Sequence, residues 1–194
     1  MLLPVFQEFL GKDCILWAVS LVVSFPRAPD QFLPRDTKAI FGDDYTVDID
    51  IPPYAITMLI PLVDCTLETG CTRVWPKSHL TKTDDEAQKV GSIDSEVNVG
   101  SVLITNSKLL HRGGVNQSKI IRPLLYLIYQ RSWLRDFAGY EERPPVTIGN
   151  RELEKVPGEY RHMFTWTKDL YRVIRIKNWL RRVLPGSLRQ LRRG

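Results

Sequence analysis

The sequence predicts an all-β core, either a sandwich or a barrel, followed by a basic helix at the C-terminal end. Short runs rich in Val, Ile, Leu and aromatic residues recur over the first 145 residues, with Gly, Pro and Asp between them. Helical periodicity is scarce before residue 150. Many short strands separated by such breakers are typical of sandwiches and barrels.

Five strands are expected, at residues 14–25, 55–63, 71–75, 101–106 and 122–130. The last of these is an almost unbroken apolar run, which is typical of a central strand. The polar stretch 29–53 is too long for a plain connection, so we expect a functional loop there. Residues 81–96 are expected to form a loop or a short helix. The adjacent Gly113 and Gly114 predict a turn with positive φ.

Three segments follow from this pattern: a lead-in over residues 1–10, a β-domain over 11–145, and a linker with a helical tail over 146–194. The lead-in is expected to be irregular or the remnant of a helix. A chain of 194 residues fits one domain with an appendage. Its 43% hydrophobic and 25% charged residues are ordinary for a folded protein and argue against a mainly disordered chain.

Positive charge is concentrated in the tail. Residues 161–194 hold ten Lys or Arg and one acid, in a chain of formal net charge +5. Apolar residues recur at helical spacing over 170–184, so an amphipathic helix is predicted there. We favour an interpretation in which its apolar stripe packs on the β-domain, with weak contact to an anionic membrane surface as the alternative. No zinc-finger spacing or aromatic-basic motif is present, so nucleic acid is not expected as a partner.

The cysteines Cys14, Cys65 and Cys71 form no CxxC pair, and their number is odd. The N-terminus lacks the pattern of a secretory signal, and no apolar run reaches about 18 residues. We therefore expect reduced thiols, a cytoplasmic location and no membrane-spanning helix.

One histidine stands in an unusual setting. His111 follows the strand expected at 101–106, and Arg122 begins the next strand eleven residues later. If these strands pair antiparallel, both side chains can face one cavity. An imidazole that binds a metal and a guanidinium that binds a carboxylate would then lie together.

Two stretches resemble a known family. Residues 68–79, ETGCTRVWPKSH, are similar to the family's NGxTxxxPGSH turn, and residues 100–126 are similar to its strands with the second metal histidine and the co-substrate arginine. The family is the phytanoyl-CoA dioxygenase-like group of Fe(II)/2-oxoglutarate oxygenases, and the resemblance covers about residues 14–135. It implies a double-stranded β-helix, or jelly-roll, fold and oxidation of a small or lipid-like substrate.

The resemblance also implies a site. Its iron ligands are a His-x-Asp pair and a distant histidine, a facial triad that leaves positions for 2-oxoglutarate and O₂. His111 matches the distant histidine, Asp36 the carboxylate, and Arg122 the residue that binds 2-oxoglutarate. Thr57 and Gln31 are weaker candidates for the co-substrate. His79 matches the turn histidine of the family and is expected to be structural.

The chain departs from the family at the first metal histidine. The family's Gln-x-x-His-x-Asp appears here as Gln31-Phe-Leu-Pro-Arg-Asp36, and Pro34 stands in the histidine position. Proline has no side-chain donor atom, so we expect iron binding to be weakened or lost. Another register, through Asp48 or Asp50, is disfavoured because both are expected to be solvated loop acids. The short stretch before the first strand further suggests a shortened or fragmentary chain.

Three functional hypotheses remain. The first is an oxygenase of this family, active or recently inactivated, that hydroxylates a small or lipid-like substrate. The second is a pseudoenzyme or binding module that keeps the fold and binds 2-oxoglutarate or another carboxylate. The third is a membrane- or nucleic-acid-associated protein whose function lies in the basic residues 161–194.

Overall fold

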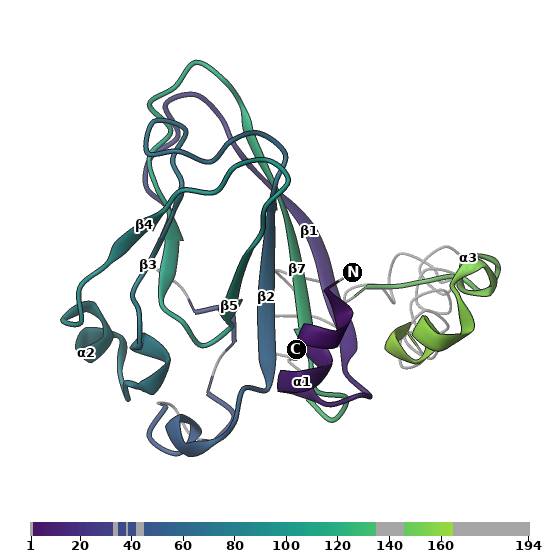
Figure 1. Ribbon diagram of the computed structural model, residues 1–194. Helices are drawn as coiled ribbons and strands as arrows, with labels where there is room; N and C mark the ends of the chain where they lie inside the picture. The colour runs from purple at the N-terminus through teal and green to yellow at the C-terminus, as the bar shows by residue number, and fades with distance from the viewer. Residues whose placement is uncertain (1, 33–34, 38, 42–44, 135–145, 165–194) are drawn as a thin grey trace, which may run out of the picture. The chain divides into compact units, whose positions relative to one another are not determined.

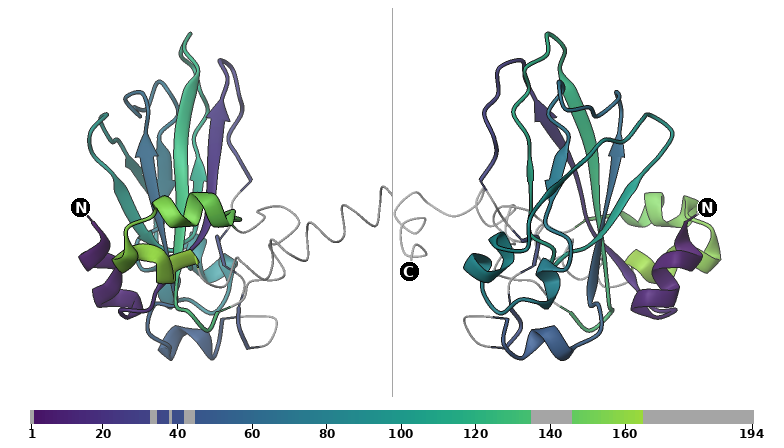
Figure 2. Two further views of the ribbon diagram at one scale, coloured as in Figure 1. Left: turned by 90° about the vertical axis from the view of Figure 1, so that its right-hand side faces the viewer. Right: turned by 60° about the vertical axis from the view of Figure 1, so that its left-hand side comes forward.

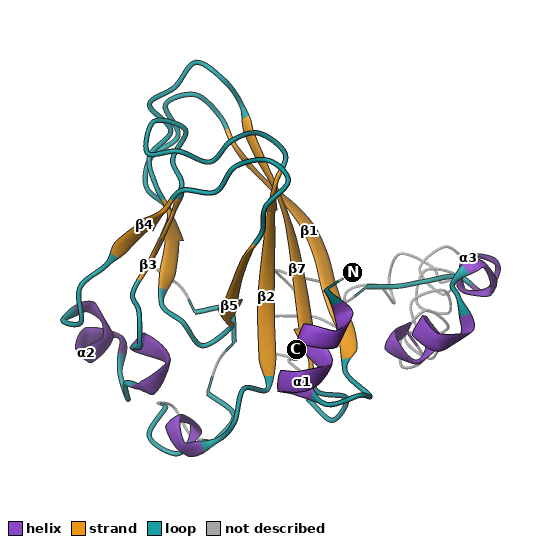
Figure 3. Ribbon diagram, viewed as in Figure 1, coloured by secondary structure: helices purple, strands orange, loops and turns teal. Residues whose placement is uncertain are grey.

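The computed structural model describes residues 2–32, 35–37, 39–41, 45–134 and 146–164. The chain forms two compact units, Met1–Pro145 and Val146–Gly194. The first unit contains two antiparallel β-sheets that form separate layers (Figures 1 and 3). The second holds the short helix α3 (Asn150–Lys155) and the 3₁₀ helix η3 (Gly158–Phe164).

The larger sheet has the strand order β1-β7-β2-β5. Its strands are β1 (Ile15–Ser24), β7 (Arg122–Gln130), β2 (Ala55–Pro61) and β5 (Leu103–Asn106). The smaller sheet has the order β4-β3-β6, with β4 (Ile93–Ser95), β3 (Thr72–Val74) and β6 (His111–Gly113). The prediction of an all-β core of jelly-roll type is confirmed, and so are the five expected strands, to within a few residues.

Helix α1 (Leu3–Leu10) covers the outer face of the larger sheet, as the views in Figures 1 and 2 agree. Phe6 and Leu10 are each 1% exposed and pack with Ile56 and Met58 of β2. The ring of Phe6 stacks on Tyr129 of β7 with 4.2 Å between centroids. The lead-in is thus a packed helix, because its apolar side chains bury the outer face of the sheet.

The inner face of the larger sheet looks toward the smaller sheet. Successive side chains of a strand point to opposite faces, so Leu59 of β2 lies inward while Met58 packs outward under α1. In β7 the same alternation turns Arg122, Leu124 and Tyr126 inward. The inner face is therefore where functional side chains can meet.

Near His111, the antiparallel pairing that was considered does not occur, and the positive φ predicted for Gly113 and Gly114 is wrong. The strand of His111 does not pair with that of Arg122, since β6 pairs with β3 while β7 pairs with β1 and β2. Gly113 and Gly114 do not adopt positive φ. Glycine is needed there for close approach: a Cβ on Gly114 would lie 3.0 Å from the carbonyl oxygen of Cys71.

Short helices lie in the connections between strands of the same sheet. Helix η1 (Asp48–Asp50) lies between β1 and β2, and η2 (Ser78–Leu80) and α2 (Asp84–Gln88) lie between β3 and β4. Strand β4 was not expected, because its exposed sequence Ile93-Asp94-Ser95 carries little apolar signal. The amphipathic helix predicted over 170–184 lies outside the described residues. Within the described ranges, no helix is long and apolar enough to cross a membrane.

Candidate metal and co-substrate site

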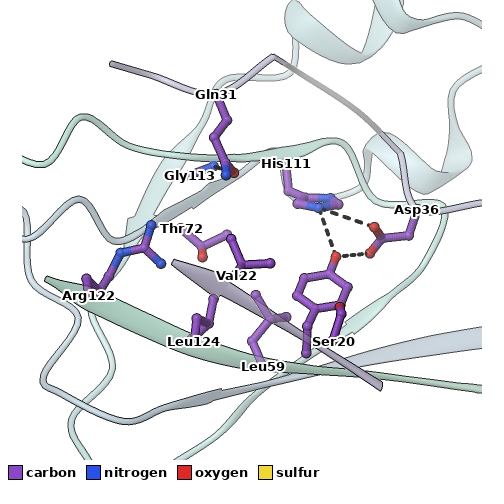
Figure 4. A pocket seen from close by; sticks show the side chains of 11 residues that line it. Ser20, Val22, Gln31, Asp36, Leu59, Thr72, His111, Gly113, Arg122 and Leu124 are labelled. Carbon is purple, nitrogen blue, oxygen red and sulfur yellow. Dashed lines mark hydrogen bonds and ion pairs between the residues drawn. The ribbon is translucent and has the colours of Figure 1, made fainter. Parts of the chain in front are cut away.

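A cavity of about 310 Å³ lies on the inner face of the larger sheet. β1, β2 and β7 contribute to it from one sheet, β3 and β6 from the other, and the loop after β1 supplies two further side chains. Its lining residues are Ser20, Val22, Gln31, Asp36, Leu59, Thr72, His111, Gly113, Arg122, Leu124 and Tyr126 (Figure 4). Apolar side chains separate two polar ends, one with His111 and Asp36 and the other with Arg122 (Figure 4).

At the first polar end, an imidazole faces a carboxylate. The Nε2 atom of His111 lies 3.7 Å from Oδ1 of Asp36. The Nδ1 atom of His111 lies 2.9 Å from the carbonyl oxygen of Leu109. Because a carbonyl only accepts, Nδ1 donates there, and Nε2 is the ring nitrogen turned toward the carboxylate. Metal-binding histidines are commonly oriented in this way.

The other carboxylate oxygen of Asp36 is held by hydroxyl groups. Thr57 donates to Oδ2 at 2.7 Å, and the phenol of Tyr126 donates to the same atom. The Tyr126 hydroxyl also lies 3.2 Å from Nε2 of His111. Thr57 in turn lies 2.9 Å from the hydroxyl of Ser107. These contacts fix the carboxylate so that Oδ1 faces the imidazole.

Backbone hydrogen bonds join the loop of Asp36 to the segment that leads into His111. The backbone N–H groups of Asp36 and Thr37 donate to the carbonyl oxygen of Ser107 at 2.9 and 3.2 Å. The guanidinium of Arg35 donates to the carbonyl oxygen of Lys108 at 2.6 Å and to Oδ1 of Asp84 at 2.6 Å. The two segments, far apart in sequence, are therefore held in one register.

Asp48 stabilises the same loop through hydrogen bonds. It is fully buried, and its carboxylate accepts from the backbone N–H of Ile40 at 2.7 Å and from the hydroxyl of Tyr54 at 2.9 Å. The expectation that Asp48 is a solvated acid is therefore wrong. Asp48 does not line the cavity, and a carboxylate committed to backbone donors stabilises the loop.

At the second polar end, Arg122 is 1% exposed and its Nε atom has no hydrogen-bond partner. Gln31 lies beside it and accepts from the backbone N–H of Gly113 at 3.1 Å. A Cβ on Gly113 would lie 2.6 Å from Oε1 of Gln31 and 3.4 Å from a terminal nitrogen of Arg122. A buried cation with an orphaned donor fits an anionic ligand, because unpaired buried charge is costly.

The buried Cys65 and the half-buried His79 are among the groups with shifted pKa values. Burial raises the pKa of the Cys65 thiol, and the nearby positive charge of Arg122 opposes this shift. Burial lowers the pKa of His79, and the cations Lys108 and Arg35 lower it further. The Nδ1 atom of His79 is buried without a hydrogen-bond partner, and this residue does not line the cavity.

The structure brings four of the five predicted site residues to the cavity wall: Gln31, Asp36, His111 and Arg122. Thr57 is the exception, since it lies behind Asp36 and is 0% exposed. Tyr126 also lines the site, and it was not among the residues that the sequence pointed to. Its spacing of two residues from Leu124 and four from Arg122 along one strand is the signal that could have placed it on the inner face.

The third ligand position of the family falls on Pro34, which lies outside the described residues. Among the residues that the structure does describe, no group of three or more His, Cys, Asp and Glu side chains could hold a metal ion. His111 and Asp36 are therefore two candidate metal ligands without a third described residue of those types beside them.

Comparison with known proteins agrees with this geometry. Residues 13–124, more than half of the chain, match the family model described as phytanoyl-CoA dioxygenase (PhyH). The chain belongs to this family of Fe(II)/2-oxoglutarate-dependent dioxygenases.

A relative of known sequence is the Fe(II)/2-oxoglutarate-dependent dioxygenase nvfF of Aspergillus novofumigatus (strain IBT 16806). It is 34% identical over 112 residues, which are 58% of this chain and 36% of the relative. The dioxygenase trt7 of Aspergillus terreus (strain NIH 2624 / FGSC A1156) is 31% identical over 57% of this chain and 38% of its own length. The match thus spans little more than a third of these relatives.

Solved structures share the fold. The crystal structure of EvdMO1 has a TM-score of 0.57 at 23% identity, covering 68% of this chain and 30% of that chain. The nickel complex of ThoJ, a non-heme monooxygenase, has a TM-score of 0.56 at 19% identity, covering 94% of this chain and 72% of that chain. At these identities the likeness shows a common jelly-roll architecture.

Proposed function

We propose that this chain binds Fe(II) and 2-oxoglutarate and oxidises a small or lipid-like substrate, with iron held more weakly than in a complete facial triad. The observation that carries the proposal is the placement of His111 and Asp36 at one end of a cavity whose other end holds the buried Arg122. Family membership supports the same assignment.

The donors present fit the iron. His111 offers the Nε2 lone pair and Asp36 offers Oδ1, and both point to the same part of the cavity. Donor atoms bound at right angles to one ion at about 2.1 Å lie about 3 Å apart, so the observed separation of 3.7 Å needs only a small closure. Bound ferrous iron with 2-oxoglutarate would supply the oxygen-activating chemistry.

The residues of the chain supply binding and orientation. Arg122 would hold the distal carboxylate of 2-oxoglutarate through its forked donors, a geometry that lysine lacks. Gln31 would contact the co-substrate beside it. Val22, Leu59 and Leu124 give the middle of the cavity apolar walls, which suit the methylene groups of a 2-oxoglutarate that spans the two polar ends.

Weaker iron binding is expected because one of the three protein ligands of the family is missing. Loss of a residue that only supports a ligand costs about 10- to 100-fold in metal affinity, and loss of a ligand costs more. Pro34 can supply no side-chain donor. We expect turnover of 2-oxoglutarate to be slow and to require iron in excess.

Anaerobic titration with Fe(II) and 2-oxoglutarate tests this proposal. The ternary complex is expected to show a weak visible charge-transfer band that is absent with either component alone, and His111→Ala should abolish it. Succinate released in air then measures turnover. Absence of the band at millimolar Fe(II) would rule out the oxygenase function.

The Arg122 end of the cavity, considered without the metal ligands, favours a second function. Arg122 is buried with an orphaned Nε, and this binding group needs no metal. A module that binds 2-oxoglutarate or another dicarboxylate would use it without turnover. A thermal shift with 2-oxoglutarate in the presence of a chelator, together with no charge-transfer band, identifies this function.

A further inference from the structure

We infer that the phenol oxygen of Tyr126 is a third iron donor, and that it takes the place of the missing histidine. The inference rests on the proposed function, because it concerns the same metal site. It begins with three donor atoms that meet at one point of the cavity wall: Nε2 of His111, the carboxylate of Asp36 and the hydroxyl of Tyr126.

The distances suit a shared ion. The Tyr126 oxygen lies 3.2 Å from Nε2 of His111, and that nitrogen lies 3.7 Å from Oδ1 of Asp36. The phenol is also hydrogen-bonded to Oδ2 of Asp36. Three ligands on one face of an octahedral ion would be about 3 Å apart, and the separations of Nε2 from the phenol oxygen and from Oδ1 are close to that value.

The contacts of the three side chains point in the same direction. Nδ1 of His111 lies 2.9 Å from the carbonyl oxygen of Leu109, which turns Nε2 toward the carboxylate and the phenol. The Tyr126 hydroxyl donates to Asp36 and lies 3.2 Å from that Nε2 atom. A cation bound at this point would contact all three side chains.

The ligand chemistry is appropriate. Tyrosine oxygen is an established ligand of protein-bound iron. On binding, the iron–oxygen bond forms as the O–H bond breaks, and the proton passes to solvent. One nitrogen and two oxygen donors would replace the two nitrogens and one oxygen of the family. Oxygen donors that carry negative charge favour the ferric ion, which sets this site apart from a histidine-rich one.

Strand β7 supplies a matched control. Tyr126 lies on its inner face, whereas Tyr129, three residues later, lies on its outer face and stacks on Phe6. Tyr126→Phe and Tyr129→Phe each remove one hydroxyl from the same strand. Only the first should change the metal site, and thermal unfolding of both variants checks that the fold is retained.

The test dialyses the protein to equilibrium against excess Fe(II) without oxygen, measures the bound metal against the free metal, and then oxidises the iron in air without 2-oxoglutarate. A phenolate on ferric iron gives strong visible absorption and resonance Raman bands of the ring. We expect both signals in the unmodified protein and in Tyr129→Phe. Tyr126→Phe should lack them and bind Fe(II) about 10- to 100-fold more weakly.

Stoichiometric iron without the visible band would overturn the inference while leaving the proposed function standing. Persistence of the band in Tyr126→Phe would also overturn it. If the unmodified protein holds no more iron than His111→Ala, the proposed function itself fails. The two failures are thereby distinguished by the amount of bound iron, which is measured before the spectrum.

Discussion

The Nε2 atom of His111 lies 3.7 Å from Oδ1 of Asp36, although the two residues are 75 positions apart and come from a strand of the smaller sheet and a loop. Hydrogen bonds from Asp36, Thr37 and Arg35 to the segment before β6 hold this pair together. Hydrogen bonds between the loop and the segment before β6 therefore position the two side chains.

Removal of the imidazole tests the pair directly. His111→Ala should lower Fe(II) affinity by more than about 100-fold, since it deletes a ligand. His79→Ala removes another imidazole that does not line the cavity, so its iron affinity should be unchanged. Equilibrium dialysis against Fe(II) without oxygen measures both. Equal affinities in the two variants would place the metal elsewhere.

A substitution at Thr57 tests whether its hydroxyl supports the ligand Asp36 or contacts the co-substrate. Thr57→Val keeps the shape but removes the hydroxyl that donates to Asp36. We expect iron affinity to fall about 10- to 100-fold, with a loss of about 1–3 kcal/mol in stability from the unpaired buried partners. Binding of 2-oxoglutarate to the metal-free protein, measured calorimetrically, should not change. If it fell instead, the hydroxyl would contact 2-oxoglutarate, as the resemblance suggested.

Arg122 lies at the other end of the cavity and is the residue proposed to bind 2-oxoglutarate. Arg122→Lys preserves the charge but loses the fork, so affinity for 2-oxoglutarate should fall by about 1.5–3 kcal/mol, or roughly 10- to 100-fold. Arg112→Lys is the matched control, because Arg112 forms its ion pair with Asp30 at 2.9 Å and does not line the cavity. A chelator-treated thermal-shift titration measures both variants. Similar affinities would show that Arg122 does not bind the co-substrate.

His79 gives the fold a pH dependence of known sign. Burial and nearby cations lower its pKa below the ordinary 6.5 of the unfolded chain. The folded state therefore resists a proton that the unfolded state accepts, so this contribution to stability is complete above pH 6.5 and is lost as the pH falls toward the folded pKa. His79→Gln should show a shallower loss of unfolding free energy between about pH 7.5 and 5.5. Parallel urea-denaturation series that gave the same slope for both proteins would contradict this account.

The sequence pattern located the strands because apolar runs and breakers are local signals. It also located His111, Arg122 and Asp36, because short motifs carry them. It could not show that His111 and Arg122 line one cavity from different sheets, since strand pairing depends on contacts between distant residues. The hydrogen bonds of Thr57 and Tyr126 to Asp36 were not predicted either. Threonine and tyrosine in a strand show the same local sequence pattern whether they pack in the core or support a ligand.

Pro34→His restores the family's first metal histidine and should raise Fe(II) affinity by at least about 10-fold, because the added ligand counts for more than a supporting contact. Residue 34 lies outside the described residues, so the register rests on its two-residue spacing from Asp36. Competition with a coloured chelator measures the gain. An unchanged affinity would mean that the loop does not follow the family register.

The most direct measurement is an anomalous difference map at the iron edge, from crystals grown without oxygen and soaked with Fe(II) and 2-oxoglutarate. The account predicts one peak within about 2.3 Å of both Nε2 of His111 and Oδ1 of Asp36, with the distal carboxylate of the keto acid on Arg122. A peak away from this pair, or a keto acid bound elsewhere while the cavity stays open, would contradict it.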